Sequence, residues 1–263
     1  MQPERLINAI IQKVFPKQKI LIDSKNEECY WDKYWQNEIN DLKKHGESRE
    51  IRDYWLNRCN QIMTKHYKEL LVGFKNKSIV ECGGGSGINS LLMAQNGARV
   101  TITDFSKKSL EYAKLIAKQL KLSTKTDFIK ADIFKFKSKQ LYDVAWNCGV
   151  IEHYEWNQAI NFIKLMKSFV KPKGKVLITI PNLLSYEIVY RMIKEGKGSE
   201  IFYSRRQLKK MMELAGLKNV KIEPLLFATP SFAPKRGQFL ENKIVANIFP
   251  PSWWLFSVVG DNL

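Results

Sequence analysis

The residues best suited to chemistry form a glycine-rich turn, GGGSG at residues 83–87, between the acidic Glu81 and an apolar segment that begins at Ile88. The composition around this turn predicts a strand, a turn and a helix in succession. Glycine lets a backbone approach a ligand closely, and the first N–H groups of a helix have no partner within it. Such a turn suits a carboxylate or a phosphate, so the sequence predicts a nucleotide-type site.

The spacing of the glycines argues against two common nucleotide sites. Dinucleotide binding prefers GxGxxG, but counting from Gly83 or Gly85 places Ile88 or Ser90 where the third glycine should stand. A P-loop needs a lysine directly after its last glycine, and none follows Gly87. The pattern is therefore GxGxG, which disfavours nicotinamide, flavin and ATP hydrolysis.

Two aspartates follow the next two predicted strands. At the carboxyl edge of an α/β sheet, Asp104 can accept hydrogen bonds from both hydroxyls of a ribose, worth about 1.5 to 3 kcal/mol each. The alternative role for Asp104 is an N-cap for the helix at Ser106. Asp132 can accept from an adenine amine, with Phe105 and Ile133 against the ring, or it can cap a turn.

The elements that position these residues alternate from Lys77 onward. Short β-branched or aromatic runs are separated by amphipathic helical stretches, which is typical of βαβ units around a parallel sheet. The predicted strands are 78–82, 99–103, 127–129, 143–147, 175–180, 220–227 and 253–259, and the predicted helices are 106–120, 158–170 and 204–215.

The first 76 residues differ from the rest and are predicted to form a helical lid or extension ahead of the core. They contain an apolar helical stripe at 3–15, an aromatic cluster at 30–35 and a polar helical segment at 47–71. Residues 77–263 form the predicted core. Two insertions in that core, at about 181–203 and 229–251, are the segments expected to select a substrate, together with the extension.

Four motifs together resemble the class I methyltransferases that depend on S-adenosylmethionine, and within them the methyltransferase-11-like group. The resemblance spans about residues 77–260 and implies a doubly wound, mostly parallel seven-stranded sheet of the Rossmann-like methyltransferase fold. The last strand, at 253–259, would be antiparallel. The motifs are Glu81-Cys-Gly-Gly-Gly-Ser-Gly, Val-Thr-Ile-Thr-Asp104, Ala-Asp132 and Asn-Cys-Gly-Val-Ile-Glu-His153.

The resemblance implies a role for each matching residue. Many relatives carry aspartate where this chain has Glu81, so the carboxylate here reaches one methylene further. The expected cofactor contacts are Glu81 and the backbone of Gly83 and Gly85 at the methionine end, Gly87 in support of the turn, Asp104 at the ribose, Asp132 at the adenine, and the backbone carbonyl of Asn147 at the amino group.

The expected reaction is methyl transfer to a small-molecule acceptor by in-line displacement, with oxygen favoured over nitrogen or carbon as the methylated atom. A hydroxyl acceptor would need a base, and His153 has a suitable ordinary pKa at the acceptor-facing edge. The alternative is that His153 only caps or packs the following helix. The aromatic cluster, which contains Tyr30, Trp31, Tyr34 and Trp35, either closes over the site or belongs to the core.

A formal charge of +17 is compatible with a nucleic acid, an anionic membrane surface or a phosphorylated substrate. The lysines are scattered, as on solvated helix faces, so the charge alone identifies no partner. An RNA methyltransferase remains an alternative, although Asn-Cys-Gly-Val at 147–150 replaces the Asn-Pro-Pro-Tyr motif of enzymes that methylate exocyclic amines. A lipid or quinone acceptor at a membrane surface is the other alternative, suggested by the segment at 249–256.

The remaining features predict a cytoplasmic enzyme. We find neither an apolar run of eighteen residues nor the pattern of a secretory signal. Four widely spaced cysteines and three histidines predict reduced thiols and no structural metal. A domain that binds the cofactor without turnover is a minority alternative, and the sequence leaves the acceptor and the oligomeric state open.

Overall fold

The computed structural model describes residues 24–138, 140–182, 201, 203–227 and 253–263. The predicted helix at 3–15 and the insertion at 229–251 lie outside the described residues, as does most of the insertion at 181–203. No helix in the described ranges is long and apolar enough to cross a membrane.

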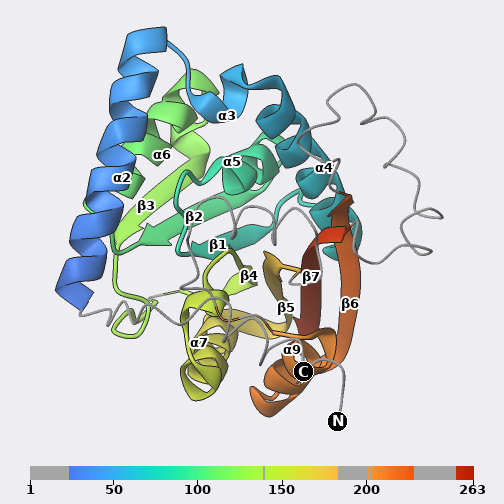
Figure 1. Ribbon diagram of the computed structural model, residues 1–263. Coiled ribbons are helices and arrows are strands. Elements are labelled where there is room, and N and C mark those ends of the chain that lie inside the picture. Colours follow the sequence, from blue (N-terminus) through green and yellow to red (C-terminus); the bar gives the residue numbers. More distant parts are fainter. Residues whose placement is uncertain (1–23, 139, 183–200, 202, 228–252) are drawn as a thin grey trace.

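The described strands form one seven-stranded sheet in the order β3-β2-β1-β4-β5-β7-β6 (Figure 1). Strands β1 to β5 pair in parallel, whereas β7 pairs antiparallel with both β5 and β6. The predicted doubly wound sheet with a final antiparallel strand is confirmed. The strands are β1 (Ser78–Cys82), β2 (Arg99–Asp104), β3 (Thr126–Lys130), β4 (Tyr142–Cys148), β5 (Val170–Pro181), β6 (Lys218–Phe227) and β7 (Trp253–Asp261).

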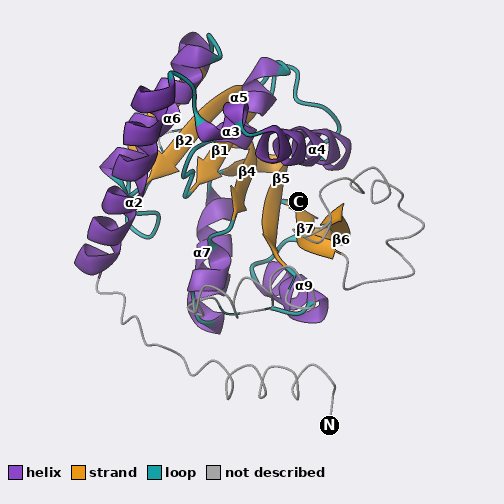
Figure 2. Ribbon diagram, turned by 45° about the horizontal axis from the view of Figure 1, so that its top comes forward, coloured by secondary structure: helices purple, strands orange, loops and turns teal. Residues whose placement is uncertain are grey.

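Helices cover both faces of the sheet, so each face buries its own hydrophobic core (Figure 2). Helices α2, α4, α5 and α6 supply the core of one face, and α7 and α9 that of the other. The helices are α2 (Ser24–His45), α3 (Arg49–Arg52), α4 (Tyr54–Leu70), α5 (Ile88–Gln95), α6 (Lys107–Gln119), α7 (Trp156–Ser168) and α9 (Arg205–Leu214), with 3-10 turns η1 (Ser123–Lys125) and η2 (Ile151–His153).

The direction of the strand crossovers reverses between β1 and β4. The chain passes from β1 to β2 on one side, and after β3 it returns to the other side of β1 to form β4. Ligands of open α/β sheets bind outside the carboxyl ends of strands at such a reversal. The glycine turn follows β1 and η2 follows β4, so the predicted motifs meet at this edge.

The structure refines the predicted N-terminal helices. The aromatic cluster lies on α2, a continuous helix of 22 residues that was not predicted as such. The segment predicted as one helix at 47–71 divides into α3 and α4 at Asp53, which is extended (φ −75°, ψ 114°). The Asp53 side chain accepts from the Leu56 N–H at 2.9 Å, so it caps a new helix instead of continuing the old one.

Candidate functional site

The glycine turn at residues 83–87 adopts a backbone that side chains would obstruct. Gly83, Gly85 and Gly87 have φ values of +77°, +54° and +65°, in the left-handed region. A Cβ at Gly83 would lie 2.8 Å from Cγ2 of Val150, and one at Gly87 would lie 2.6 Å from Cδ1 of Ile102. The turn is therefore pressed onto the sheet and leads directly into the N-terminus of α5.

Asp104 ties the end of β2 to this turn. It is buried, and its two carboxylate oxygens accept from the backbone N–H groups of Gly85 at 2.9 Å and Ser106 at 2.8 Å. Burial raises the pKa of Asp104, and the bond from Gly85 opposes that rise. The N-cap of α6 is Ser106, whose hydroxyl accepts from the Ser109 N–H at 3.0 Å. Asp104 is thus not the helix cap considered from the sequence.

Glu81 is a buried carboxyl group that lies beneath the turn. Burial raises the pKa of Glu81 well above its ordinary value, a hydrogen bond with Ser90 opposes this rise, and the nearby charge of Asp104 adds to it. Ser90 in turn accepts from the indole N–H of Trp146 at 2.9 Å. The Oε2 atom of Glu81 has no hydrogen-bond partner in the part of the chain that is described. A hydrogen-bond donor on a bound ligand can satisfy a buried oxygen of this kind.

Asp132 caps a turn after β3, the structural role considered for it from the sequence. Its Oδ1 accepts from the Phe134 N–H at 3.0 Å, and its Oδ2 lies 3.2 Å from the ammonium of Lys135. Ile133 is buried in the core beside α7. Phe105, between β2 and α6, is half-buried. The second face of the Asp132 carboxylate stays accessible, because the side chain is 36% exposed.

Asn147 has its side chain turned away from the glycine turn. It is fully buried, and its amide donates to the sulfur of Met166 at 3.1 Å, on the α7 side. The Oδ1 atom of Asn147 has no hydrogen-bond partner among the described residues. Burial and the charge of Glu152 raise the pKa of Cys148 to about 12, so this thiol is not a nucleophile near neutral pH.

His153 lies in η2, directly after β4. Its imidazole packs edge to face against the indole of Trp31, with ring centroids 6.3 Å apart. Burial lowers the pKa of His153, because loss of hydration disfavours the charged imidazolium. The ring is therefore neutral near pH 7, which is the form that can accept a proton.

Helix α2 contacts the glycine turn through Trp35, a member of the aromatic cluster considered from the sequence as a cover, and contacts the start of α6 through Asp32, which the sequence reasoning missed. The Trp35 ring lies 3.0 Å from the position of a Cβ on Gly85. Asp32, one turn earlier, accepts from the Ser106 hydroxyl at 2.5 Å and from the Lys108 N–H at 3.2 Å. The three-residue spacing of Asp32 and Trp35 places both on one helix face. That spacing is the signal that could have identified them.

Metal and disulfide chemistry find no support in the described ranges. No group of three or more histidine, cysteine, aspartate or glutamate side chains gathers there as a metal site. The four cysteines are free thiols.

Comparison with known proteins relates the chain to enzymes. The profile of a family described as a methyltransferase domain matches residues 54–222. A ubiquinone biosynthesis O-methyltransferase of Vibrio atlanticus is 29% identical over 182 residues, which cover 65% of this chain and 75% of that protein.

Solved structures share the fold at low sequence identity. Magnesium protoporphyrin IX methyltransferase from Synechocystis PCC 6803, crystallised with SAH, superposes with a TM-score of 0.64 and 12% identity, covering 92% of this chain and 100% of that one. The cyclase SpnF superposes with a TM-score of 0.59 and 16% identity, covering 80% and 83%. The second neighbour is named for a different reaction, so the fold by itself does not determine the chemistry.

Proposed function

The chain belongs to the methyltransferase-domain family and uses S-adenosylmethionine, and from this premise we propose that it methylates a hydroxyl oxygen of a small-molecule acceptor. The observation that carries the proposal is the 29% identity to a ubiquinone biosynthesis O-methyltransferase, which suggests a phenolic, quinone-type acceptor. The neutral His153 beside Trp31 supports an acceptor that must lose a proton.

The residues at the carboxyl edge fit the cofactor on chemical grounds. S-adenosylmethionine carries an ammonium, a carboxylate and a sulfonium, so it is a net cation. The unmatched Oε2 of Glu81 offers an acceptor for the ammonium once the carboxyl group has lost its proton, and the buried carboxyl group of Asp104 lies nearby. The left-handed glycines leave the backbone bare for close contact.

We assign the cofactor contacts accordingly. Glu81 and the Asn147 carbonyl would hold the ammonium, and Asp104 would accept from the ribose hydroxyls with its remaining lone pairs. Asp132 would accept from the adenine amine, with Phe105 and Ile133 beside the ring. The backbone of Gly83 and Gly85, with Gly87 in support, would bind the methionine end.

The protein chiefly has to align the acceptor and exclude water, because the bound cofactor supplies a methyl group already activated by a positive sulfur. When bound, the cofactor would supply an electrophilic methyl group to the acceptor oxygen, and its sulfur would keep the electron pair of the broken carbon–sulfur bond. His153 would take the hydroxyl proton of the acceptor. Trp31 fixes the imidazole by its edge contact and keeps solvent from it.

We also assign a covering role to the N-terminal extension of residues 1–76. The contacts of Trp35 with the glycine turn and of Asp32 with the start of α6 support this role. In this proposal α2 forms part of the binding site.

The test combines binding with turnover. Calorimetric titration should show that S-adenosylmethionine binds while NADH and ATP do not. A methyl-labelled cofactor is then offered with catechols, hydroquinones, amines and total RNA. Labelled methyl ether from a phenolic acceptor supports the proposal. Label on nitrogen, on carbon or on RNA would contradict methylation of a small-molecule oxygen. Absence of cofactor binding by the folded protein would overturn the proposed function as a whole.

The His153→Gln variant tests the base. We expect kcat to fall about 100-fold or more while cofactor affinity stays within about twofold, because general-base catalysis contributes roughly 10² to 10⁴. The loss should shrink as pH rises and the acceptor ionises unaided. An unchanged kcat would remove His153 from the mechanism.

A further inference from the structure

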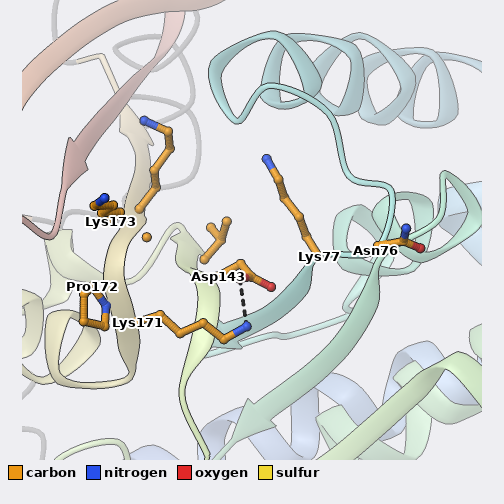
Figure 3. Close-up of a pocket in the computed structure, with 9 residues that line it drawn as sticks. Asn76, Lys77, Asp143, Lys171, Pro172 and Lys173 are labelled. Atoms are coloured by element: carbon orange, nitrogen blue, oxygen red, sulfur yellow. Dashed lines mark hydrogen bonds and ion pairs between the residues drawn. The ribbon is translucent and has the colours of Figure 1, made fainter.

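The opposite edge of the sheet, where β1 and β4 begin, contains a cavity. Its volume is about 340 Å³. It lies between the start of β1, the start of β4 and residues 171–175 at the start of β5 (Figure 3). We infer that this cavity, which we call the lysine pocket, binds a compact, multiply charged anion of the phosphate class. Its polar lining comprises Asn76, Lys77, Asp143, Lys171, Lys173 and Lys175.

The carboxylate in the lysine pocket is fully engaged by the protein. Asp143 Oδ1 pairs with the ammonium of Lys171 at 2.8 Å, the contact drawn as a dashed line in Figure 3. Its Oδ2 accepts from both the backbone N–H and the hydroxyl of Ser78, at 2.7 and 2.8 Å. Asp143 therefore forms its close ion pair with Lys171, and at longer range its charge also acts on Lys77.

One of the other three lysines of the lining has an acidic partner outside the lining. Lys175 pairs with Asp261 of β7 at 2.5 Å. Asp261 also accepts from the amide of Asn219 at 2.9 Å.

Lys77 and Lys173 form no ion pair with any residue of the described ranges. Lys77 donates to the carbonyls of Leu71 and Val72, which are neutral. Lys173 is exposed. Burial and the charge of Lys175 lower the pKa of Lys77, and the charge of Asp143 opposes this fall. Ammonium groups that are held close enough to repel each other are stabilised by an anion between them.

The size and donor set of the lysine pocket define the ligand. A volume of about 340 Å³ is at the lower end for small-molecule sites, which span roughly 300 to 1,000 Å³. Lysine binds phosphate oxygens as a mobile point charge, and the Asn76 amide adds a neutral donor. A ligand with two or three ionised phosphate oxygens matches this set better than a monocarboxylate does.

The lysine pocket is separate from the proposed cofactor site. The five residues of β1 lie between them, a rise of roughly 16 Å for an extended strand. The inference therefore does not depend on the reaction at the carboxyl edge, and the two sites can fail independently.

Inorganic pyrophosphate serves as the probe, titrated calorimetrically at low ionic strength because salt screens such contacts. Lys173→Gln is the informative variant, since its exposed side chain supports no packing. We expect it to weaken pyrophosphate binding about tenfold, as loss of one charge-assisted contact would. Lys209→Gln, which removes an equal charge from the exposed face of α9, should change the affinity less than about twofold.

Further outcomes separate this site from the carboxyl edge. Saturation with S-adenosylmethionine should leave the pyrophosphate affinity unchanged, and the amide resonances of Lys173, Gly174 and Lys175 should shift on titration. No binding by the wild-type protein, equal losses in both variants, or competition with the cofactor would each overturn the lysine pocket. Failure of the cofactor to bind would overturn the proposed function and leave the pyrophosphate result intact.

Discussion

The two edges of the sheet differ in the type of ionisable group and in its burial: the carboxyl edge holds buried acids and the amino edge holds lysines. At the carboxyl edge, Glu81 and Asp104 are buried acids in a chain of net charge +17. At the amino edge, the lysine pocket combines partly buried and exposed cations. Net charge therefore identifies neither site, because each depends on a few groups that are desolvated or concentrated locally.

Helix direction explains part of this difference. In a parallel α/β sheet the helices point their N-termini, which carry partial positive charge, at the carboxyl edge, and their C-termini at the amino edge. Lysines near helix C-termini need no ligand to account for them, and Lys77 caps the end of α4 in this way. Lys173 lies near the start of strand β5 and not at a helix end, so it has no capping role. It is the residue that best distinguishes a binding site from a set of helix caps.

The largest expected effect is at the carboxyl edge. Asp104→Ala should weaken S-adenosylmethionine binding by about 100-fold or more, since two charge-assisted hydrogen bonds and the tether to Gly85 are lost together. Asp127→Ala, at an exposed position of β3, is the matched control and should bind normally. Calorimetry measures both. Equal affinities in the two variants would remove Asp104 from the site.

Two glycine-to-alanine variants separate the effect of the Trp35 contact on cofactor binding from the effect of a left-handed backbone. Gly85→Ala should lower cofactor affinity by about tenfold or more, because the new methyl group meets Trp35 in addition to a left-handed φ. Gly46→Ala has a similar φ but open space, and it should lower only the free energy of unfolding, by about 1 kcal/mol. Equal binding losses in both would show that the contact with α2 is irrelevant.

Substitution of Glu81 should have a smaller effect, and that effect should depend on pH. Its raised pKa means that the folded protein retains a proton that the unfolded chain loses, so stability falls as pH rises from the ordinary carboxyl range through the raised value. Glu81→Gln should flatten this fall in denaturant unfolding of the free protein. The cofactor ammonium should expel the proton, so wild-type affinity should rise as pH rises above the ordinary carboxyl range, as long as the pH stays below the pKa of an α-amino group. A Gln variant with the same pH profile would refute the ammonium contact.

The smallest expected effect is the sharpest test of separation between the edges. Lys173→Gln should leave S-adenosylmethionine affinity within about twofold, because screening removes most of a single exposed charge over that distance. The same variant is the one expected to lose pyrophosphate. A parallel loss of cofactor affinity would mean that the two edges are coupled or that the substitution disturbs the sheet.

Prediction of the elements succeeded where local signals coincide with burial. Strand β1 has the predicted bounds because its β-branched residues end at a glycine turn. Strand β5 begins at Val170, earlier than predicted, because Lys-Pro-Lys-Gly at 171–174 looks like a turn, yet Val170 already pairs with Tyr142 of β4. Helix α2 was not predicted because it is largely polar, and Ile39 and Leu42 become buried only where the helix packs on the core.

The sequence by itself determined the glycine turn, the acids Glu81 and Asp104 at the carboxyl ends of β1 and β2, and the order of strands and helices in the core. These depend on backbone preferences and on spacing over a few residues, which are local properties. Only the tertiary structure decided that Asp32 meets Ser106, that Trp35 covers Gly85, and that Lys77 shares a cavity with Lys173. Those contacts join residues far apart in the chain, and their geometry follows from how helices and strands pack around the two cores.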